Sequence, residues 1–283
     1  MRLKYRNNKG VSLDLSGGTY LLDGAALFDY AWSYTARGTG RDSYIEAFYR
    51  NTIEKAVDIE IKAHNRHVFA AALNHFHDVT HTDIALAQYG RLELDTGEYM
   101  LCHIPAVKKP VWKDDIRAVV CNVTILTTRP AWCRDVHYFH GLQGDREHRG
   151  DDLGYPHGYP HDYGMFVGMS LVQNNHYTPC EFEMTMYGPV TNPEVKIGPN
   201  VYAIGTESNP VALLTSSDRI IINSREREAK QHSGNGVVID RYNDRVKEYG
   251  GFELIPTGAS PTSANCRFSL TFFQERSDPT WSL

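Results

Sequence analysis

Short runs of apolar residues that alternate with polar ones dominate the chain. Residues 91–95 and 98–104 are two such runs on either side of Thr96-Gly97, which predicts a β-hairpin. Residues 116–126 form a longer run with one apolar face. That face carries Val119, Cys121, Val123 and Ile125. In the second half, runs separated by Gly, Pro, Asn and Ser predict strands over 182–188, 194–198, 201–205, 219–223, 236–240, 252–256 and 267–273. This spacing is typical of an antiparallel sandwich or barrel.

One segment has helical rather than strand periodicity. Between His64 and Val79 the apolar residues recur every three or four positions, which predicts an amphipathic helix. Its apolar stripe consists of Val68, Phe69, Ala72, Leu73, Phe76 and Val79. A second, short helical stretch is predicted near residues 84–87. The fold class is therefore mainly β with minor α, and we expect the helix to pack on the strands of the first half.

The chain is expected to divide at a polar segment. Residues 139–164 are rich in Gly, Asp, His, Pro and Tyr and lack aliphatic periodicity, which predicts a loop or extended linker. We therefore expect one domain over residues 1–134, a linker or arm over 135–164, and a second domain over 165–283. The linker has too little apolar surface to fold alone, but it could order against a neighbouring chain.

A Pro-x-Trp sequence follows a long predicted strand twice. Pro130 and Trp132 follow the strand at 116–126, and Pro279 and Trp281 follow the strand at 267–273. Proline removes a donor from the strand ladder, and the tryptophan can then fold back as an apolar plug. The repetition indicates that each sequence closes one structural unit, although coincidence is also compatible with it.

Composition and charge exclude several protein classes. The chain has 283 residues, of which 41% are apolar and 22% charged, so it should bury a core. Its formal net charge of -5 argues against a dedicated nucleic-acid binder. The first ten residues contain no apolar run, so we expect no signal peptide, and no segment is apolar enough to cross a bilayer. Five widely spaced cysteines indicate buried thiols in a reducing cytosol rather than disulfides.

Five blocks of the sequence, in this order, resemble the siphophage distal tail protein (Dit) family, which forms the baseplate hub of long-tailed, non-contractile bacteriophages. They are residues 4–34, 90–104 with 111–132, 182–205, 219–230 and 251–281. The last block contains Ile255-Pro256-x-Gly258 and ends in Pro279-Thr280-Trp281. In the family, residues 219–230 correspond to a strand that ends in a polar turn and restarts. The resemblance covers nearly the whole chain apart from 135–164.

This resemblance implies a fold and a role. The first domain would be an N-terminal split β-barrel plus helix, related to tail-tube proteins, and six copies would close into a ring. The second would be a galectin-like β-sandwich. The chain would be a structural hub of the virion tail tip, assembled in the host cytoplasm, with a role in host attachment. It would join the tail (tube) protein to the tail-associated hub or lysin protein, the tape measure protein and receptor-binding proteins.

We expect no enzymatic activity, no cofactor, no bound metal and no membrane partner. Genomic DNA would pass through the ring without specific binding. A net acidic balance is compatible with a lumen that repels phosphate.

An aromatic-rich segment, residues 29–49, is the candidate ring interface. Its large aromatic residues are Tyr30, Trp32, Tyr34, Tyr44, Phe48 and Tyr49. Aromatic side chains are enriched at protein interfaces, but they also fill protein cores. The sequence leaves both interpretations open.

Three other functions compete with the hub. His64, His67, His75, His77 and His81 crowd one region, and a pair three residues apart could share a helix face in a metal-binding protein. However, most of them fall on the polar side of the predicted helix. A hydrolase lacks support, because no nucleophile elbow, P-loop or dinucleotide fingerprint is present. A carbohydrate-binding module would need an exposed aromatic platform in the second half, where Trp281 is the only tryptophan.

Overall fold

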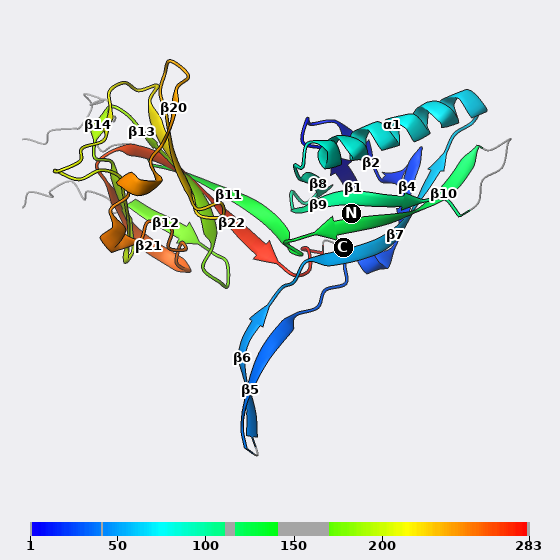
Figure 1. Ribbon diagram of the computed structural model, residues 1–283, viewed down its shortest axis with the longest axis horizontal. Helices are drawn as coiled ribbons and strands as arrows, with labels where there is room; N and C mark the ends of the chain where they lie inside the picture. The colour runs from blue at the N-terminus through cyan, green and yellow to red at the C-terminus, as the bar shows by residue number, and fades with distance from the viewer. Residues whose placement is uncertain (1, 41, 111–116, 141–169, 282–283) are drawn as a thin grey trace, which may run out of the picture. The chain divides into compact units, whose positions relative to one another are not determined.

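The chain divides into two units, which are linked by two passages of the backbone (Figure 1). The computed structural model describes residues 2–40, 42–110, 117–140 and 170–281. Unit 1 comprises Met1–Arg134 and Glu275–Leu283, and unit 2 comprises Asp135–Gln274. The chain passes between the units in strands β11 (Trp132–His140) and β22 (Arg267–Arg276). The second domain expected from the sequence ran to the end of the chain, whereas the final residues belong to unit 1.

Unit 1 is built on an antiparallel sheet with the order β11-β9-β10-β7-β4-β3. Strand β8 also pairs with β9, and β1 pairs with both β8 and β2. The strand bounds are β1 Leu3–Arg6, β2 Ser12–Asp14, β3 Ser16–Gly17, β4 Tyr20–Asp23, β7 Ile53–Lys62, β8 Gly90–Leu94, β9 Tyr99–Lys108 and β10 Ala118–Thr127. A short 3-10 helix, η1 (Ala25–Leu27), follows β4.

Two strand predictions for the first half are confirmed. The predicted hairpin is β8–β9, and Gly97 in its turn has a φ of 84°, which favours glycine. The predicted apolar face of β10 is buried, and Val123 pairs directly with Val57 of β7. Strand β7 was missed, although Val57, Ile59 and Ile61 alternate with charged residues along it.

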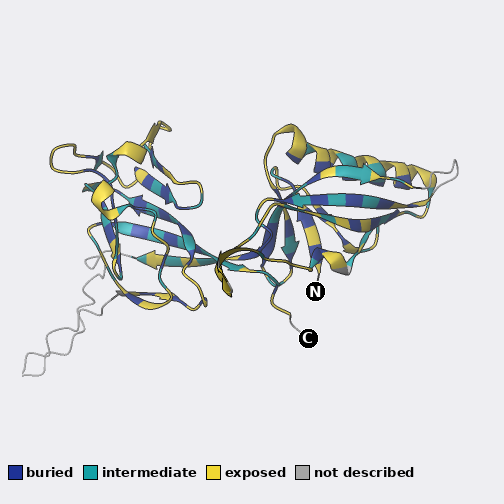
Figure 2. Cartoon of the chain, turned by 60° about the horizontal axis from the view of Figure 1, so that its bottom comes forward, coloured by how far each residue is buried: buried dark blue, intermediate teal, exposed yellow. Residues whose placement is uncertain are grey.

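Helix α1 (Arg66–Ala85) packs on this sheet. Asn65 caps its first turn, because its side chain accepts a hydrogen bond from the Val68 backbone N–H at 2.9 Å. Most of the predicted stripe is confirmed as buried or partly buried, and Figure 2 shows exposed residues on the opposite side of the helix. Val68 is the exception, because it is 39% exposed although the next residue, Phe69, is buried. The stretch predicted near 84–87 is not a second helix, since α1 itself continues to Ala85.

A buried carboxylate ties the end of α1 to the first strand. Asp83 is fully buried, and it accepts hydrogen bonds from the Tyr5 hydroxyl and, at 2.8 Å, from the Asn8 backbone N–H. Burial raises the pKa of Tyr5, and the hydrogen bond to Asp83 raises it further, so the Tyr5 hydroxyl remains a donor. Gly90 leaves room for this pair, because a Cβ there would lie 2.3 Å from both oxygens.

Unit 2 consists of two facing sheets. One has the order β20-β19-β18-β13-β22-β11, the other has the order β12-β21-β15-β16, and β14 pairs with β17. Side chains from both sheets share one buried cluster, which makes the unit a β-sandwich. The elements are β12 Ser170–Asn174, β13 Glu181–Tyr187, β14 Val190–Thr191, β15 Glu194–Ile197, β16 Asn200–Ala203, β17 Ala212–Leu213, β18 Arg219–Asn223, β19 Glu228–His232, β20 Val238–Asp240, η2 Tyr242–Asp244, η3 Lys247–Tyr249 and β21 Gly258–Ala264.

Most strands predicted for the second half are confirmed, and residues 219–230 form the expected hairpin, β18–β19. The strand predicted at 252–256 is wrong. Gly250 and Gly251 bend the backbone with φ of 73° and 85°, and only Ile255 forms an isolated bridge, to Cys180.

The linker prediction is partly wrong, because residues 135–140 belong to β11. The Tyr138 and His140 rings lie 6.1 and 5.0 Å from the ring of Phe268 and so pack on the core of unit 2. The rest of the predicted linker, 141–164, lies outside the described residues.

All five cysteines are buried thiols and none forms a disulfide, as the sequence predicted. Burial raises the pKa of Cys266 to about 12. Among the described residues, no helix is both long and apolar enough to span a membrane.

The Asp83 contact gives a stability prediction. Asp83→Ala should destabilise unit 1 by about 2–4 kcal/mol, because the Tyr5 hydroxyl and the Asn8 N–H lose their buried acceptor. All four tryptophans belong to unit 1, so urea unfolding followed by tryptophan fluorescence reports on this unit. Asp78→Ala, on the exposed side of the same helix, is the matched control and should change stability by less than about 0.5 kcal/mol. Equal unfolding midpoints for the two variants would contradict the assigned role.

Candidate assembly surface

A two-stranded hairpin leaves the sheet and helix of unit 1 and projects away from them (Figure 1). It consists of β5 (Ser33–Thr39) and β6 (Asp42–Tyr49), which pair with each other and with no other described strand. Every residue of β6 is exposed. An isolated two-stranded hairpin is marginally stable in water. This hairpin therefore has little packing of its own to stabilise it.

The six aromatic residues predicted as a ring interface all lie on this hairpin or on the segment that leads into it. Tyr30, Trp32, Tyr34, Tyr44, Phe48 and Tyr49 are each between 43% and 58% exposed. Packing in the core, the alternative left open by the sequence, is therefore wrong for the single chain. The Tyr34 and Phe48 rings meet edge to face across the two strands, with centroids 6.3 Å apart.

A β-bulge collects apolar side chains on one face of the hairpin. Thr35 pairs with Ala47, but the next residue, Ala36, pairs with Ile45, so Glu46 is the additional residue. Directly paired residues point to the same side of a sheet. Ile45 therefore shares a side with Phe48, whereas strict alternation along β6 would place it on the opposite side.

The apolar face of the hairpin thus consists of Tyr34, Ala36, Ile45 and Phe48. The other face carries an ion pair between Arg37 and Glu46 at 3.5 Å, together with Tyr44 and Tyr49. The two faces consequently differ in chemistry, and the apolar one is the better candidate for contact with another protein.

The hairpin root is fixed by the C-terminal segment, residues 275–281. The Arg50 guanidinium lies 4.4 Å from the centre of the Trp32 ring and 3.3 Å from the Glu275 carboxylate. Ser277 Oγ accepts hydrogen bonds from Trp32 Nε1 at 3.2 Å and from Arg50 Nη2 at 3.3 Å. Trp32 precedes β5 and Arg50 follows β6, so both ends of the hairpin are held by one segment.

The two Pro-x-Trp sequences meet in unit 1 rather than closing a unit each. The Phe28 ring stacks on Trp132 at 5.6 Å and meets the edge of Trp281 at 5.2 Å. Pro130, Pro279 and Trp132 are buried, as a plug requires. Trp281 is 57% exposed, so it covers Phe28 without becoming a buried plug.

A second buried carboxylate holds the C-terminal segment in place. Glu98 is 2% exposed and accepts hydrogen bonds from the Thr280 backbone N–H at 2.9 Å and from the Thr280 hydroxyl at 2.8 Å. Thr96 Oγ1 donates a further hydrogen bond at 3.1 Å. Three donors therefore satisfy a carboxylate that burial would otherwise penalise. The sequence showed no signal for this contact, because its partners lie far apart along the chain.

The histidine cluster does not form a metal site in the described part of the chain. No group of three or more His, Cys, Asp or Glu residues with metal-binding geometry occurs there. His64 precedes the capping residue Asn65, so His64 and His67 do not share a helix face. His77 accepts a hydrogen bond from Lys109 Nζ at 3.0 Å, and burial together with the Lys109 charge lowers the pKa of His77.

These features define a class: a mainly β protein with one helix, a β-sandwich unit and an exposed aromatic hairpin. No protein-family model and no curated protein sequence matches the chain. Solved phage structures do match it in fold. The Dit protein of phage SPP1, described as a hub adsorption apparatus of phages that infect Gram-positive bacteria, matches with a TM-score of 0.61 at 8% identity, covering 97% of this chain and 99% of that chain.

Two structures of the phage P2 baseplate in its activated conformation match as well. The form with calcium gives a TM-score of 0.63 at 11% identity, and the form with strontium gives 0.64 at 12%. In both cases the match covers 98% of this chain and 99% of the baseplate chain. The likeness therefore extends through both units, and the mainly β fold that the sequence resemblance implied is confirmed.

The Glu98 contact predicts how firmly the C-terminal segment is bound. Glu98→Ala removes the acceptor of both Thr280 donors, which should cost about 1–3 kcal/mol. The segment should then open more often, and trypsin should cleave after the exposed Arg276 roughly ten times faster, as mass spectrometry would measure. Glu54→Ala, an exposed carboxylate on β7, is the control and should leave the rate unchanged. Unchanged cleavage in Glu98→Ala would show that other contacts hold the segment.

Proposed function

We propose that this chain is the structural hub of a siphophage tail tip, in which six copies form a ring that joins the tail tube to the receptor-binding apparatus. The observation that carries the proposal is the exposed aromatic hairpin in a chain whose fold follows phage hub and baseplate proteins over 97–98% of its length. A shared fold alone does not establish a shared function. The hairpin supplies a surface of the kind that assembly requires.

The hairpin gives the ring a physical basis. A ring of identical copies needs two different faces of one subunit that match each other. The apolar face of Tyr34, Ala36, Ile45 and Phe48 is one such face, and the outer edges of β5 and β6 offer backbone groups that a neighbouring strand can pair with. An interface of this kind typically buries about 2,000 Å² or more. Covering the hairpin would also supply the packing that it lacks in a single chain.

The finer structural expectations belong to the same proposal. Unit 1 would be a split β-barrel of the tail-tube type. Supporting this, the Leu22 N–H of β4 donates at 2.9 Å to the carbonyl of Leu15, the residue that connects β2 to β3. Unit 2 would be a galectin-like sandwich. The partners would be the major tail protein, the tail-associated hub or lysin protein, the tape measure protein and receptor-binding proteins. Genomic DNA would pass through the lumen, and the chain would have a structural role rather than catalyse a reaction.

The ring can be tested with two hairpin variants. Wild-type protein should form particles of six copies, measured by light scattering after size exclusion and imaged for six-fold symmetry. Phe48→Glu should yield folded single chains, because it places a charge in the apolar face without touching the hairpin root. Thr35→Glu, on the opposite face, is the matched control and should still assemble. Circular dichroism would establish that both variants are folded.

Three results would contradict the proposal: a wild-type chain that remains single, a Phe48→Glu variant that still forms rings, or equal loss of rings in both variants. Trp32 is a poorer test site than Phe48, because its contacts with Arg50 and Ser277 hold the hairpin root.

A further inference from the structure

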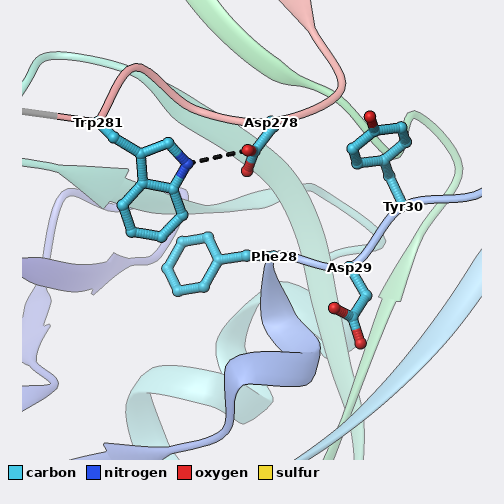
Figure 3. A pocket seen from close by; sticks show the side chains of 5 residues that line it. All are labelled: Phe28, Asp29, Tyr30, Asp278 and Trp281. Atoms are coloured by element: carbon cyan, nitrogen blue, oxygen red, sulfur yellow. Dashed lines mark hydrogen bonds between the residues drawn. The ribbon is translucent and has the colours of Figure 1, made fainter.

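A small open pocket lies where the segment leading to the hairpin meets the C-terminal segment. It has a volume of about 440 Å³ and is lined by Phe28, Asp29, Tyr30, Asp278 and Trp281. Figure 3 shows the Trp281 ring over Phe28, with the Asp278 carboxylate beside them and Tyr30 on the far side. All five residues belong to unit 1. We call this site the aromatic pocket.

The Lys55 side chain fixes the backbone path of residues 26–29. Its ammonium donates to the carbonyl oxygens of Leu27, at 2.6 Å, and of Asp29. Burial lowers the pKa of Lys55, and the nearby Asp29 charge partly opposes that shift. The backbone that carries Phe28, Asp29 and Tyr30 is therefore held in place rather than free to collapse into the pocket.

The Asp278 carboxylate is held in place by a hydrogen bond but forms no ion pair with a described lysine or arginine. Asp278 Oδ2 accepts a hydrogen bond from Trp281 Nε1 at 2.8 Å. No lysine or arginine in the described residues forms an ion pair with Asp278. Arg50, at the hairpin root, is engaged with Glu275 and Trp32.

Three aromatic rings beside the Asp278 carboxylate favour one kind of ligand group. A guanidinium is planar, stacks on aromatic faces and binds carboxylates through two parallel N–H donors. A neutral polar group gains neither the ion pair nor the cation–π attraction. The volume of the pocket also falls within the range of roughly 300–1,000 Å³ that is typical of small-ligand sites.

We propose that the aromatic pocket receives an arginine side chain from a second copy of this chain. The choice of a second copy rests on the ring proposed above and on continuity with the hairpin. Tyr30 lies three residues before β5, so a neighbouring copy that covers the hairpin also reaches the pocket. The pocket would then add a polar contact that fixes the register of an otherwise apolar interface.

The chemistry of the pocket can be measured without the ring. Phe48→Glu protein labelled with fluorotryptophan would be titrated with N-acetyl-arginine amide, and the Trp281 signal, assigned with Trp281→Phe, followed by fluorine NMR. N-acetyl-citrulline amide, which has the same shape without the charge, is the control ligand. We expect millimolar binding of the arginine compound and at least about five-fold weaker binding of the citrulline compound. Asp278→Asn keeps an acceptor for Trp281 and should weaken binding of the arginine compound about five-fold.

The source of the arginine is tested by assembly of the chain without the Phe48→Glu change. Asp278→Asn should weaken self-association at least five-fold, whereas Asp78→Asn on the exposed side of α1 should not. Equal binding of the two ligands, or no effect of Asp278→Asn on binding, would overturn the assigned chemistry. If the ligands bind as expected but self-association of Asp278→Asn is unchanged, the arginine does not come from a second copy. A wild-type chain that never self-associates would overturn the ring and the second copy together, while the titration still decides what the pocket binds.

Discussion

The return of the C-terminal segment to unit 1 is the constraint on which the rest of the structure depends. Unit 2 lies in the sequence between β11 and the end of β22, so the last contacts of unit 1 come from residues that follow unit 2. Thr280 satisfies the buried Glu98 carboxylate, and Glu275 and Ser277 hold the hairpin root. Without these residues a buried carboxylate would lose two of its donors, which is an unfavourable state for any folded chain.

This arrangement makes the order of the hairpin depend on residues 275–281, and so bears on the assembly proposed above. A hairpin whose root is loose presents its aromatic side chains in many orientations, and each orientation lost on binding costs entropy. The contacts of Arg50 with Trp32 and Glu275 limit those orientations in the single chain. Because the same C-terminal segment also supplies Asp278 and Trp281, the aromatic pocket and the ordered hairpin form together. A chain without residues 275–281 would therefore lack the aromatic pocket and the ordered hairpin root at once.

Local patterns predicted the elements whose buried residues lie close together in sequence. The stripe of α1, the apolar face of β10 and the turn at Gly97 each specify their own structure. Strand β7 also carries such a pattern, because its buried residues alternate with charged ones. Strand β21 carried none, because its sequence, GASPTSA, is polar and contains a proline. It becomes a strand because β12 and β15 pair with its two edges, which is a tertiary effect that no local pattern reports.

The candidate surface shows the same limit more sharply. Residue types alone could not separate an interface from a core, because Tyr34, Ile45 and Phe48 suit either environment. The strand register decides which side chains share a face. One additional residue, Glu46, moves Ile45 to the side of Phe48, and the Glu46 carboxylate lies beside Arg37. Among the described residues, no other strand pairs with this ribbon, which has a charged pair on one face and exposed apolar side chains on the other. The exposed area is a free-energy cost to the single chain, and burial against another protein, as proposed above, would offset it.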